Sequence, residues 1–149
     1  MFLLRRPVIG YTSGVFDLFH VGHLNLLIAA KSLCDRLVVG VSTDELVAYK
    51  HKKPVIPFDE RIQIVRACSY VDVAIAQESL DKVEAHKRLK FDSLFVGDDW
   101  HGDPGWVEME TNLIDSGVKI HYFPYTRTTS STLINQTLID MRAPQVDKN

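Results

Sequence analysis

Long apolar runs and a surplus of charge are both missing from this sequence of 149 residues. No stretch approaches the roughly 18 consecutive apolar residues that a membrane-spanning helix needs, and residues 1–7 hold no apolar core of signal-peptide length. We therefore expect a cytoplasmic protein without a membrane partner. The formal net charge of −2 gives no overall basic field of the kind that nucleic-acid-binding proteins use, so nucleic acid is not an expected partner either.

Paired cysteines and glycine-rich phosphate loops are also missing. Cys34 and Cys68 form no CxxC pair and have no His or Cys near them at zinc-ligand spacing. Both lie in apolar segments, which favours small buried side chains in a reducing compartment. The chain has neither a GxxxxGK loop nor a GxGxxG turn, so any phosphate site must be built differently.

The composition is that of an ordinary globular domain, with 46% hydrophobic and 24% charged residues. A chain of this length buries well over half of its unfolded surface and needs no disulfide or structural metal to fold. We predict a single domain over residues 1–141, followed by a polar tail over residues 142–149.

The hydrophobic pattern alternates between short apolar runs and segments with helical spacing. Strands are predicted at Pro7–Tyr11, Asp35–Val41, Val71–Ala76, Ser93–Gly97 and Val118–Phe123. Helices are predicted at Gly22–Leu33, Phe58–Cys68, Leu80–Leu89, Val107–Ser116 and Ser130–Met141, and polar loops at Ala48–Lys53 and Asp98–Trp106. This alternation predicts an α/β fold of three layers, Rossmann-like, with a five-stranded parallel sheet and helices on both faces. Ligands bind at the carboxyl ends of such strands, so we expect the chemistry just after Tyr11, Val41, Val96 and Phe123.

The segment GVFDLFHVGH, Gly14–His23, stands at the predicted turn from the first strand into the first helix. Free backbone N–H groups and the helix dipole make such a turn an anion site. His20 and His23 are three residues apart, with Gly22 between them, and can donate hydrogen bonds to phosphate oxygens whose charge grows in a transition state. Two other interpretations stay open: surface histidines on a helix, or metal ligands, for which no third ligand stands at a fixed spacing.

GVFDLFHVGH resembles the HxGH signature of the nucleotidyltransferase superfamily, which includes the cytidylyltransferases and small adenylyltransferases. Further segments, in the same order along the chain, most resemble the glycerol-3-phosphate cytidylyltransferase family. They are VSTDE (Val41–Glu45), KHKKP (Lys50–Pro54), Glu60–Arg61, YVD (Tyr70–Asp72), VGDDW (Val96–Trp100) and RT…SST (Arg127–Thr132). Together they cover nearly the whole predicted domain.

The resemblance implies an enzyme that transfers CMP from CTP to glycerol 3-phosphate, or to a similar phosphorylated alcohol, and releases pyrophosphate. It also implies a homodimer, and Mg²⁺ that arrives with the triphosphate; we name no protein ligand for this metal. The attacking phosphate monoester is ionised near neutral pH, because its second pKa is about 6, so the reaction needs no general base. The chain accordingly shows no Ser/His/Asp or Cys/His arrangement.

The resemblance also assigns roles to residues. His20 and His23 would hold the triphosphate, Lys50 would cover the α-phosphate with Lys52 as a weaker partner, and Arg127 would reach the β- and γ-phosphates. Other residues expected at the nucleotide are Val15, Phe16, Gly22, Asp99, Trp100, Thr128, Ser131 and Thr132. Residues expected at the acceptor are Asp17, Lys50, Lys52, Arg61 and Lys82, with Asp17 orienting its loop rather than doing chemistry.

One departure from the family pattern leaves the base open. Cytidylyltransferases carry RTEGIST before the last helix, whereas this chain reads RTTSST, which is similar to adenylyltransferases of the same superfamily. The alternatives are therefore an adenylyltransferase acting on a sugar phosphate, pantetheine phosphate or FMN, and a nucleotide-binding module without turnover. Simpler interpretations also stand: the lysines as a solvated loop, Arg61 as a helix-surface ion pair, and Ser131 and Thr132 as helix caps.

Overall fold

The computed structural model describes residues 4–49, 51–100, 103–124 and 128–144, and in these ranges five strands form one parallel sheet. The strands are β1 (Ile9–Gly14), β2 (Arg36–Ser42), β3 (Val73–Gln77), β4 (Ser93–Gly97) and β5 (Lys119–Phe123). The helices are α1 (Val21–Ser32), α2 (Asp44–Ala48), α3 (Phe58–Ala67), α4 (Lys82–Leu89), α5 (Pro104–Asp115), α6 (Ser131–Arg142) and the short 3₁₀ helix η1 (Asp98–Trp100). The predicted fold class is confirmed.

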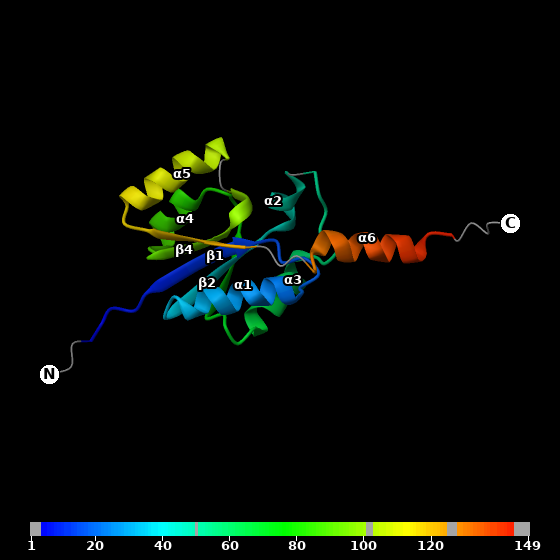
Figure 1. Cartoon of the computed structure of the whole chain (residues 1–149), viewed down its shortest axis with the longest axis horizontal. Coiled ribbons are helices and arrows are strands. Elements are labelled where there is room, and N and C mark those ends of the chain that lie inside the picture. Colours follow the sequence, from blue (N-terminus) through cyan, green and yellow to red (C-terminus); the bar gives the residue numbers. More distant parts are fainter. Residues whose placement is uncertain (1–3, 50, 101–102, 125–127, 145–149) are drawn as a thin grey trace.

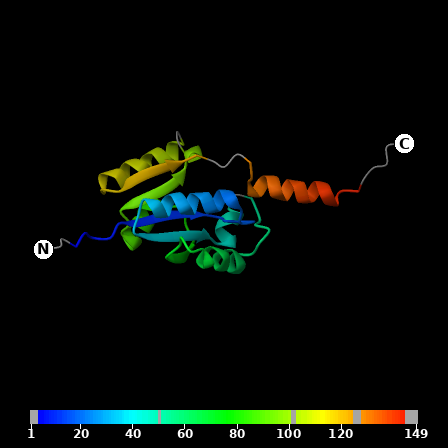
Figure 2. The same ribbon diagram turned by 60° about the horizontal axis from the view of Figure 1, so that its bottom comes forward.

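Alternating side chains on the central strands build two cores, one on each face of the sheet. In β2, Leu37, Val39 and Val41 face the core that α1 and α3 cover, whereas Val38 belongs to the core under α4 and α5. All four side chains are less than a tenth exposed, so burial of apolar surface fixes which face each one takes. Figures 1 and 2 show the three layers that result.

The strand order is β3-β2-β1-β4-β5, so the chain runs outward from β1 in both directions. The two halves of the sheet meet only where β1 pairs with β4, over the register pairs Gly10–Ser93, Tyr11–Leu94 and Thr12–Phe95. A reversal of strand order opens a crevice at the carboxyl ends of the two strands that flank it. The fold therefore positions a ligand site beyond Gly14 and Gly97.

Two local predictions are wrong. The predicted loop at Asp98–Trp106 contains η1 and the first turn of α5, whose N-cap is Asp103 and whose first residue is Pro104. Helix α2 was not expected, because its five residues are too few for a helical period to show; Thr43 caps it by accepting a hydrogen bond from the Leu46 N–H.

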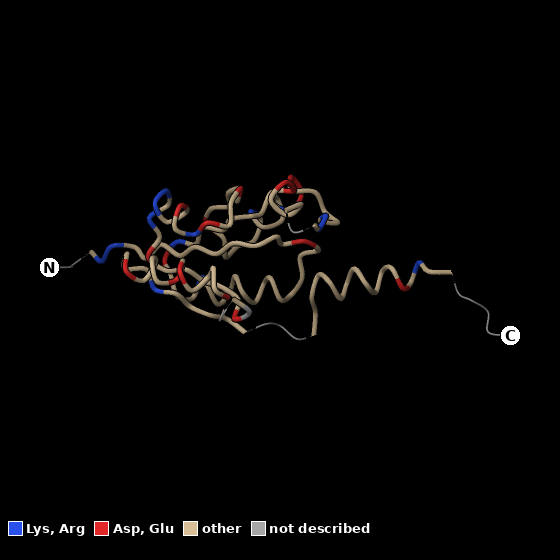
Figure 3. The backbone as a smooth tube through the Cα atoms, turned by 90° about the horizontal axis from the view of Figure 1, so that it is seen from above, with Lys and Arg blue, Asp and Glu red and all other residues tan. Residues whose placement is uncertain are grey.

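Helix α6 projects away from the body of the domain (Figures 1 and 2). None of its residues is buried, and Leu133, Ile139 and Met141 are 51%, 53% and 77% exposed. Figure 3 shows charged residues of both signs over the body but few on α6, which carries only Asp140 and Arg142. In the part of the chain described, no helix has the length and apolar character required to span a bilayer.

Candidate active site

The two histidines form the N-terminal cap of α1. His20 is the N-cap residue, and its Nδ1 accepts a hydrogen bond from the Gly22 N–H at 3.0 Å; His23 Nδ1 accepts one from the His20 N–H at 3.2 Å. The imidazole rings stack with their centroids 3.9 Å apart. Because each Nδ1 accepts a backbone hydrogen bond, the neutral form of each ring carries its proton on Nε2. Both histidines are thus set to donate from Nε2.

The surroundings keep the histidine pair neutral at physiological pH. The pKa of His23 is lowered to about 4, chiefly by burial and secondly by the neighbouring His20, whereas the carboxylate of Asp17 acts in the opposite direction. Burial also lowers the pKa of His20. A neutral pair carries no repulsion between rings that are in stacking contact, and a bound polyanion would favour protonation of both.

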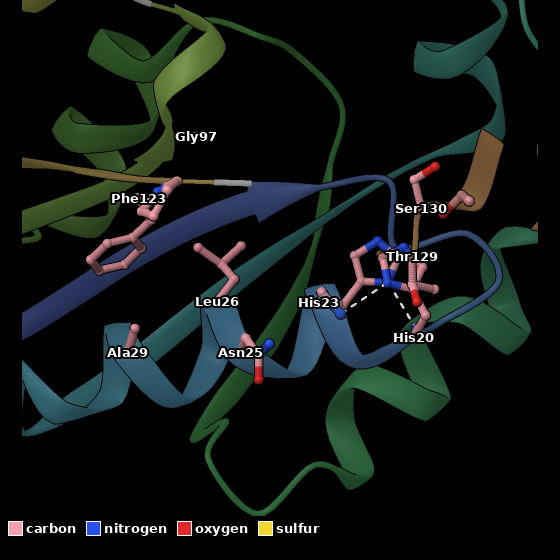
Figure 4. A pocket seen from close by; sticks show the side chains of 12 residues that line it. His20, His23, Asn25, Leu26, Ala29, Gly97, Phe123, Thr129 and Ser130 are labelled. Atoms are coloured by element: carbon pink, nitrogen blue, oxygen red, sulfur yellow. Dashed lines mark hydrogen bonds between the residues drawn. The ribbon is translucent and has the colours of Figure 1, made fainter. Parts of the chain in front are cut away.

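The histidine pair lines a cleft of about 550 Å³, which is in the size range of small-molecule sites. Its walls come from α1, the ends of β4 and β5, and the start of α6. The lining residues are His20, Gly22, His23, Asn25, Leu26, Ala29, Gly97, Phe123, Pro124, Thr129, Ser130 and Ser131. Figure 4 shows Thr129 and Ser130 beside the two histidines, with Phe123 and Leu26 further along the cleft.

Two helix N-termini meet at this cleft. His20 caps α1, and Ser130 caps α6 by accepting a hydrogen bond from the Leu133 N–H at 3.0 Å. Each N-terminus presents the positive end of a helix dipole. None of the described lining residues is Lys, Arg, Asp or Glu, so within this lining the attraction for an anion rests on dipoles and neutral donors.

The loop between β1 and α1 is held by contacts with two distant segments. The Asp17 carboxylate accepts hydrogen bonds from the Val55 N–H at 2.8 Å and the Ile56 N–H at 2.9 Å, and the Asp17 carbonyl accepts one from the Ser131 hydroxyl. Asp17 therefore connects the segment after the lysines to the start of α6. These contacts fix the position of the β1–α1 loop relative to both segments, and the expected role of Asp17 at the acceptor stays a prediction.

Arg61 is fully buried and forms hydrogen bonds with the loops at Val15 and Ile56, the end of β2 and the start of α2. Its Nη1 donates to the carbonyls of Val15 and Ser42, its Nε to the carbonyl of Ile56, and its Nη2 to the Asp44 carboxylate, at 2.6–2.8 Å. A guanidinium with 0% exposure offers no surface to a substrate, so the expected acceptor contact and the helix-surface interpretation are both wrong for Arg61. The residue joins the loops that carry the site.

A family model described as cytidylyltransferase-like matches residues 11–140. The chain belongs to this cytidylyltransferase-like family. It is a nucleotidyltransferase.

Individual relatives cover most of this nucleotidyltransferase. The glycerol-3-phosphate cytidylyltransferase of Bacillus spizizenii is 33% identical over 131 residues, which are 87% of this chain and 96% of the relative. The FAD synthase of Archaeoglobus fulgidus is 39% identical over 98 residues, 66% of this chain and 71% of the relative. The crystal structure of the lipopolysaccharide core biosynthesis protein from Thermoplasma volcanium is 25% identical, has a TM-score of 0.69, and matches 83% of this chain and 100% of its own.

Of the residues predicted at the nucleotide and catalytic sites, the cleft of this nucleotidyltransferase brings together His20, His23, Gly22 and Ser131. Ser130, not Ser131 or Thr132, is the N-cap of α6, so the predicted capping role of those two residues is wrong. Lys50 and Arg127 lie outside the described residues, as does the side chain of Asp99.

The other predicted residues do not line the cleft. Phe16 is buried in the core beside His23, with ring centroids 5.3 Å apart, and Val15 contacts Arg61 through its carbonyl. Lys82 is buried at the first turn of α4, on the face of the sheet opposite α1. Trp100 packs against the same far core, and Lys52, Thr128 and Thr132 are exposed.

The sequence predicts the position of the cleft but not most of the residues that form its wall. Asn25, Leu26 and Ala29 lie on α1 within two turns of His23; Gly97 is the last residue of β4 and Pro124 directly follows β5. The positions after Val96 and Phe123 were expected from the strand-end rule, but apolar residues on α1 gave no signal that separates a cleft wall from core. Among the described residues, no group of three or more His, Cys, Asp or Glu side chains could hold a metal ion.

Proposed function

We propose that this nucleotidyltransferase transfers CMP from CTP to glycerol 3-phosphate, or to a similar small phosphorylated alcohol, and releases pyrophosphate. The observation that carries the proposal is the stacked His20–His23 pair, with both Nε2 atoms left to donate, at a cleft where two helix N-termini meet. The acceptor follows from the Bacillus relative, which this chain matches over nearly its whole length.

The histidines would act on the α-phosphate as it changes geometry. Neutral Nε2–H donors held by backbone hydrogen bonds need no reorganisation when charge grows on the phosphate oxygens, which is the condition under which such donors lower a barrier most. The N-termini of α1 and α6 would attract the triphosphate from two sides. The apolar walls at Leu26, Ala29 and Phe123 suit the flat face of a base.

The acceptor would attack through its own phosphate oxygen. This oxygen is ionised near neutral pH, so no side chain has to remove a proton. Lys50 and Lys52 would bring the two negatively charged reactants together, and Arg127 would hold the leaving pyrophosphate in a bidentate contact. Transfer then depends on positioning and charge stabilisation, as in other phosphoryl-group reactions.

Mg²⁺ is part of the proposal as a companion of the triphosphate. The described residues offer it no cluster of ligands, so the phosphate oxygens would hold most of its coordination sphere. The proposed homodimer and cytoplasmic location follow from the family resemblance and from the sequence, and the exposed apolar side chains of α6 favour a partner subunit.

The adenylyltransferase alternative has its own support. The Archaeoglobus FAD synthase is 39% identical over the part it shares with this chain, and the RTTSST segment departs from the cytidylyltransferase pattern. Pyrophosphate release should therefore be measured with CTP and with ATP, each against glycerol 3-phosphate, phosphoethanolamine, a sugar phosphate, pantetheine phosphate and FMN, with and without Mg²⁺. We expect release that requires both CTP and glycerol 3-phosphate; release only with ATP would move the chain to the adenylyltransferase alternative.

The histidine pair is tested by His23→Ala. We expect turnover to fall by about 100-fold or more, the loss typical of removing a donor that acts on developing charge. His86→Ala is the matched control, because His86 is a half-buried histidine of α4 that packs on Phe91, away from the cleft. Turnover that persists in His23→Ala would contradict the catalytic role, and CTP binding by titration without any turnover in the wild type would favour the binding-module alternative.

A further inference from the structure

The backbone of the β1–α1 loop adopts a conformation that is intrinsically unfavourable. Phe16 and Leu18 have φ values of 56° and 50°, in the left-handed region that is unfavourable for non-glycine residues. Asp17 stands between them. Such a conformation persists only where the surrounding structure over-determines it.

Three sets of hydrogen bonds hold the loop in this conformation, and all three come from segments distant in sequence. Arg61 holds the Val15 carbonyl at 2.6 Å, and the backbone N–H groups of Val55 and Ile56 hold the Asp17 carboxylate. The Ser131 hydroxyl holds the Asp17 carbonyl across 114 positions of sequence. The loop in turn holds the catalytic pair, because the rings of Phe16 and Phe19 lie 5.3 Å and 5.4 Å from the ring of His23.

The segment held by Asp17 begins directly after the lysines. Lys52 and Lys53 are exposed and stand two or three residues before Val55, with only Pro54 between. A carboxylate that accepts two consecutive N–H groups fixes both the position and the direction of the chain it binds. Asp17 thus sets where the lysine segment lies relative to the histidines and to the N-terminus of α6.

We propose that Asp17 is a positioning residue of the transfer reaction: it touches no substrate and fixes the distance between the lysine segment, the histidine pair and Ser131. This inference rests on the proposed function, because it assigns the lysine segment to the acceptor phosphate. An attacking oxygen that is misplaced by about 1 Å costs on the order of 100-fold in rate. The Asp17 carboxylate governs that placement from outside the cleft.

The test is Asp17→Asn, which keeps the size of the side chain. The amide retains one acceptor oxygen but presents an NH₂ group to the second backbone N–H, so the hold on the Val55–Ile56 pair weakens. We expect the KM for glycerol 3-phosphate to rise about tenfold or more, with kcat lowered, because the attacking group loses its placement. The KM for CTP should stay within about twofold, since the cleft walls on α1 and β5 are untouched.

Asp92→Asn is the matched control. The Asp92 carboxylate also accepts a backbone N–H, that of Ile9 at 2.9 Å, but at the amino end of β1, the opposite edge of the sheet from the cleft. We expect a loss of thermal stability comparable with that of Asp17→Asn and unchanged kinetics. Equal kinetics in the two variants, at a temperature well below both melting transitions, would overturn the positioning role.

A double-substitution cycle separates positioning from a merely structural effect. If Asp17 acts through the lysine segment, Asp17→Asn should raise the acceptor KM little further in a Lys52→Ala, Lys53→Ala background. Fully multiplicative effects would overturn the coupling. Absence of turnover in the wild type with every acceptor would overturn the proposed function and the role that rests on it, whereas wild-type turnover with an unchanged Asp17→Asn enzyme would overturn only the role of Asp17.

Discussion

His23 both stabilises the N-terminus of α1 and makes the stability of the fold depend on pH. Its Nδ1 stabilises the N-terminus of α1, and the burial that this requires lowers its pKa to about 4, below the usual 6.5. Below pH 6.5 the unfolded chain binds a proton at this position that the folded chain does not, so the free energy of unfolding rises with pH over this window. The contribution is complete above about pH 6.5 and is lost as the pH falls toward 4.

We therefore expect His23→Gln to flatten the acid side of the stability profile. Glutamine can accept the His20 N–H as in an ordinary capping box, but it does not titrate. Between pH 7 and pH 5 the wild type should lose about 1–2 kcal/mol more than the variant, measured by urea unfolding at each pH. Contributions of the carboxylates are common to both proteins and cancel in the difference. Parallel profiles would contradict the lowered pKa.

Single residues also show where sequence reasoning ends. The histidines could be found because their spacing and their place at a strand-to-helix turn are local properties. Arg61 could not be placed, because its partners Val15, Ser42 and Ile56 come from three separate segments, two loops and the end of β2, that only the folded chain brings together. The same holds for the contact between Asp17 and Ser131.

At the scale of elements, the pairing of β1 and β2 depends on a close approach that only glycine allows. A Cβ on Gly40 would lie 2.3 Å from the hydroxyl oxygen of Tyr11, whose side chain is 1% exposed and stacks on Phe91 at 5.0 Å. We expect Gly40→Ala to lower the free energy of unfolding by about 1–3 kcal/mol, the usual cost of overpacking a core. Denaturant unfolding measures the loss, which should be smaller in a Tyr11→Phe background; an equal loss there would contradict the proposed clash.

Elements were predictable where their pattern was long enough. All five strands and the five longer helices were found, since their apolar residues have places on two defined cores. The start of α5 was missed although Asp103–Pro104 is a sound N-terminal signal, because the surrounding Gly and Asp residues favoured a loop. The error at α2 has a different origin, since five residues carry too little periodicity.

For the whole molecule, α6 is the element that the domain itself does not explain. A helix of 12 residues without a buried side chain is marginal in water, so a partner subunit that covers it would account for its sequence. Light scattering coupled to size exclusion should give a dimer, and Ile139→Asp with Met141→Asp should give a monomer. Val107→Asp with Ile114→Asp is the control, because these exposed residues on α5 receive the same charge. A dimer that survives the α6 changes would exclude this helix from the interface.

The pairing of β1 with β4 joins the two halves of the sheet, and the cleft lies across this junction. On the β1 side of the junction the cleft is walled by α1. On the β4 side it is walled by Gly97, Phe123 and Pro124, at the ends of β4 and β5. A nucleotide in the cleft would lie across the single β1–β4 strand pair, which is in register over three residue pairs. A nucleotide that contacts both halves of the sheet would stabilise their association by mass action. The free energy needed to separate the two halves would then be lowest in the enzyme without bound nucleotide.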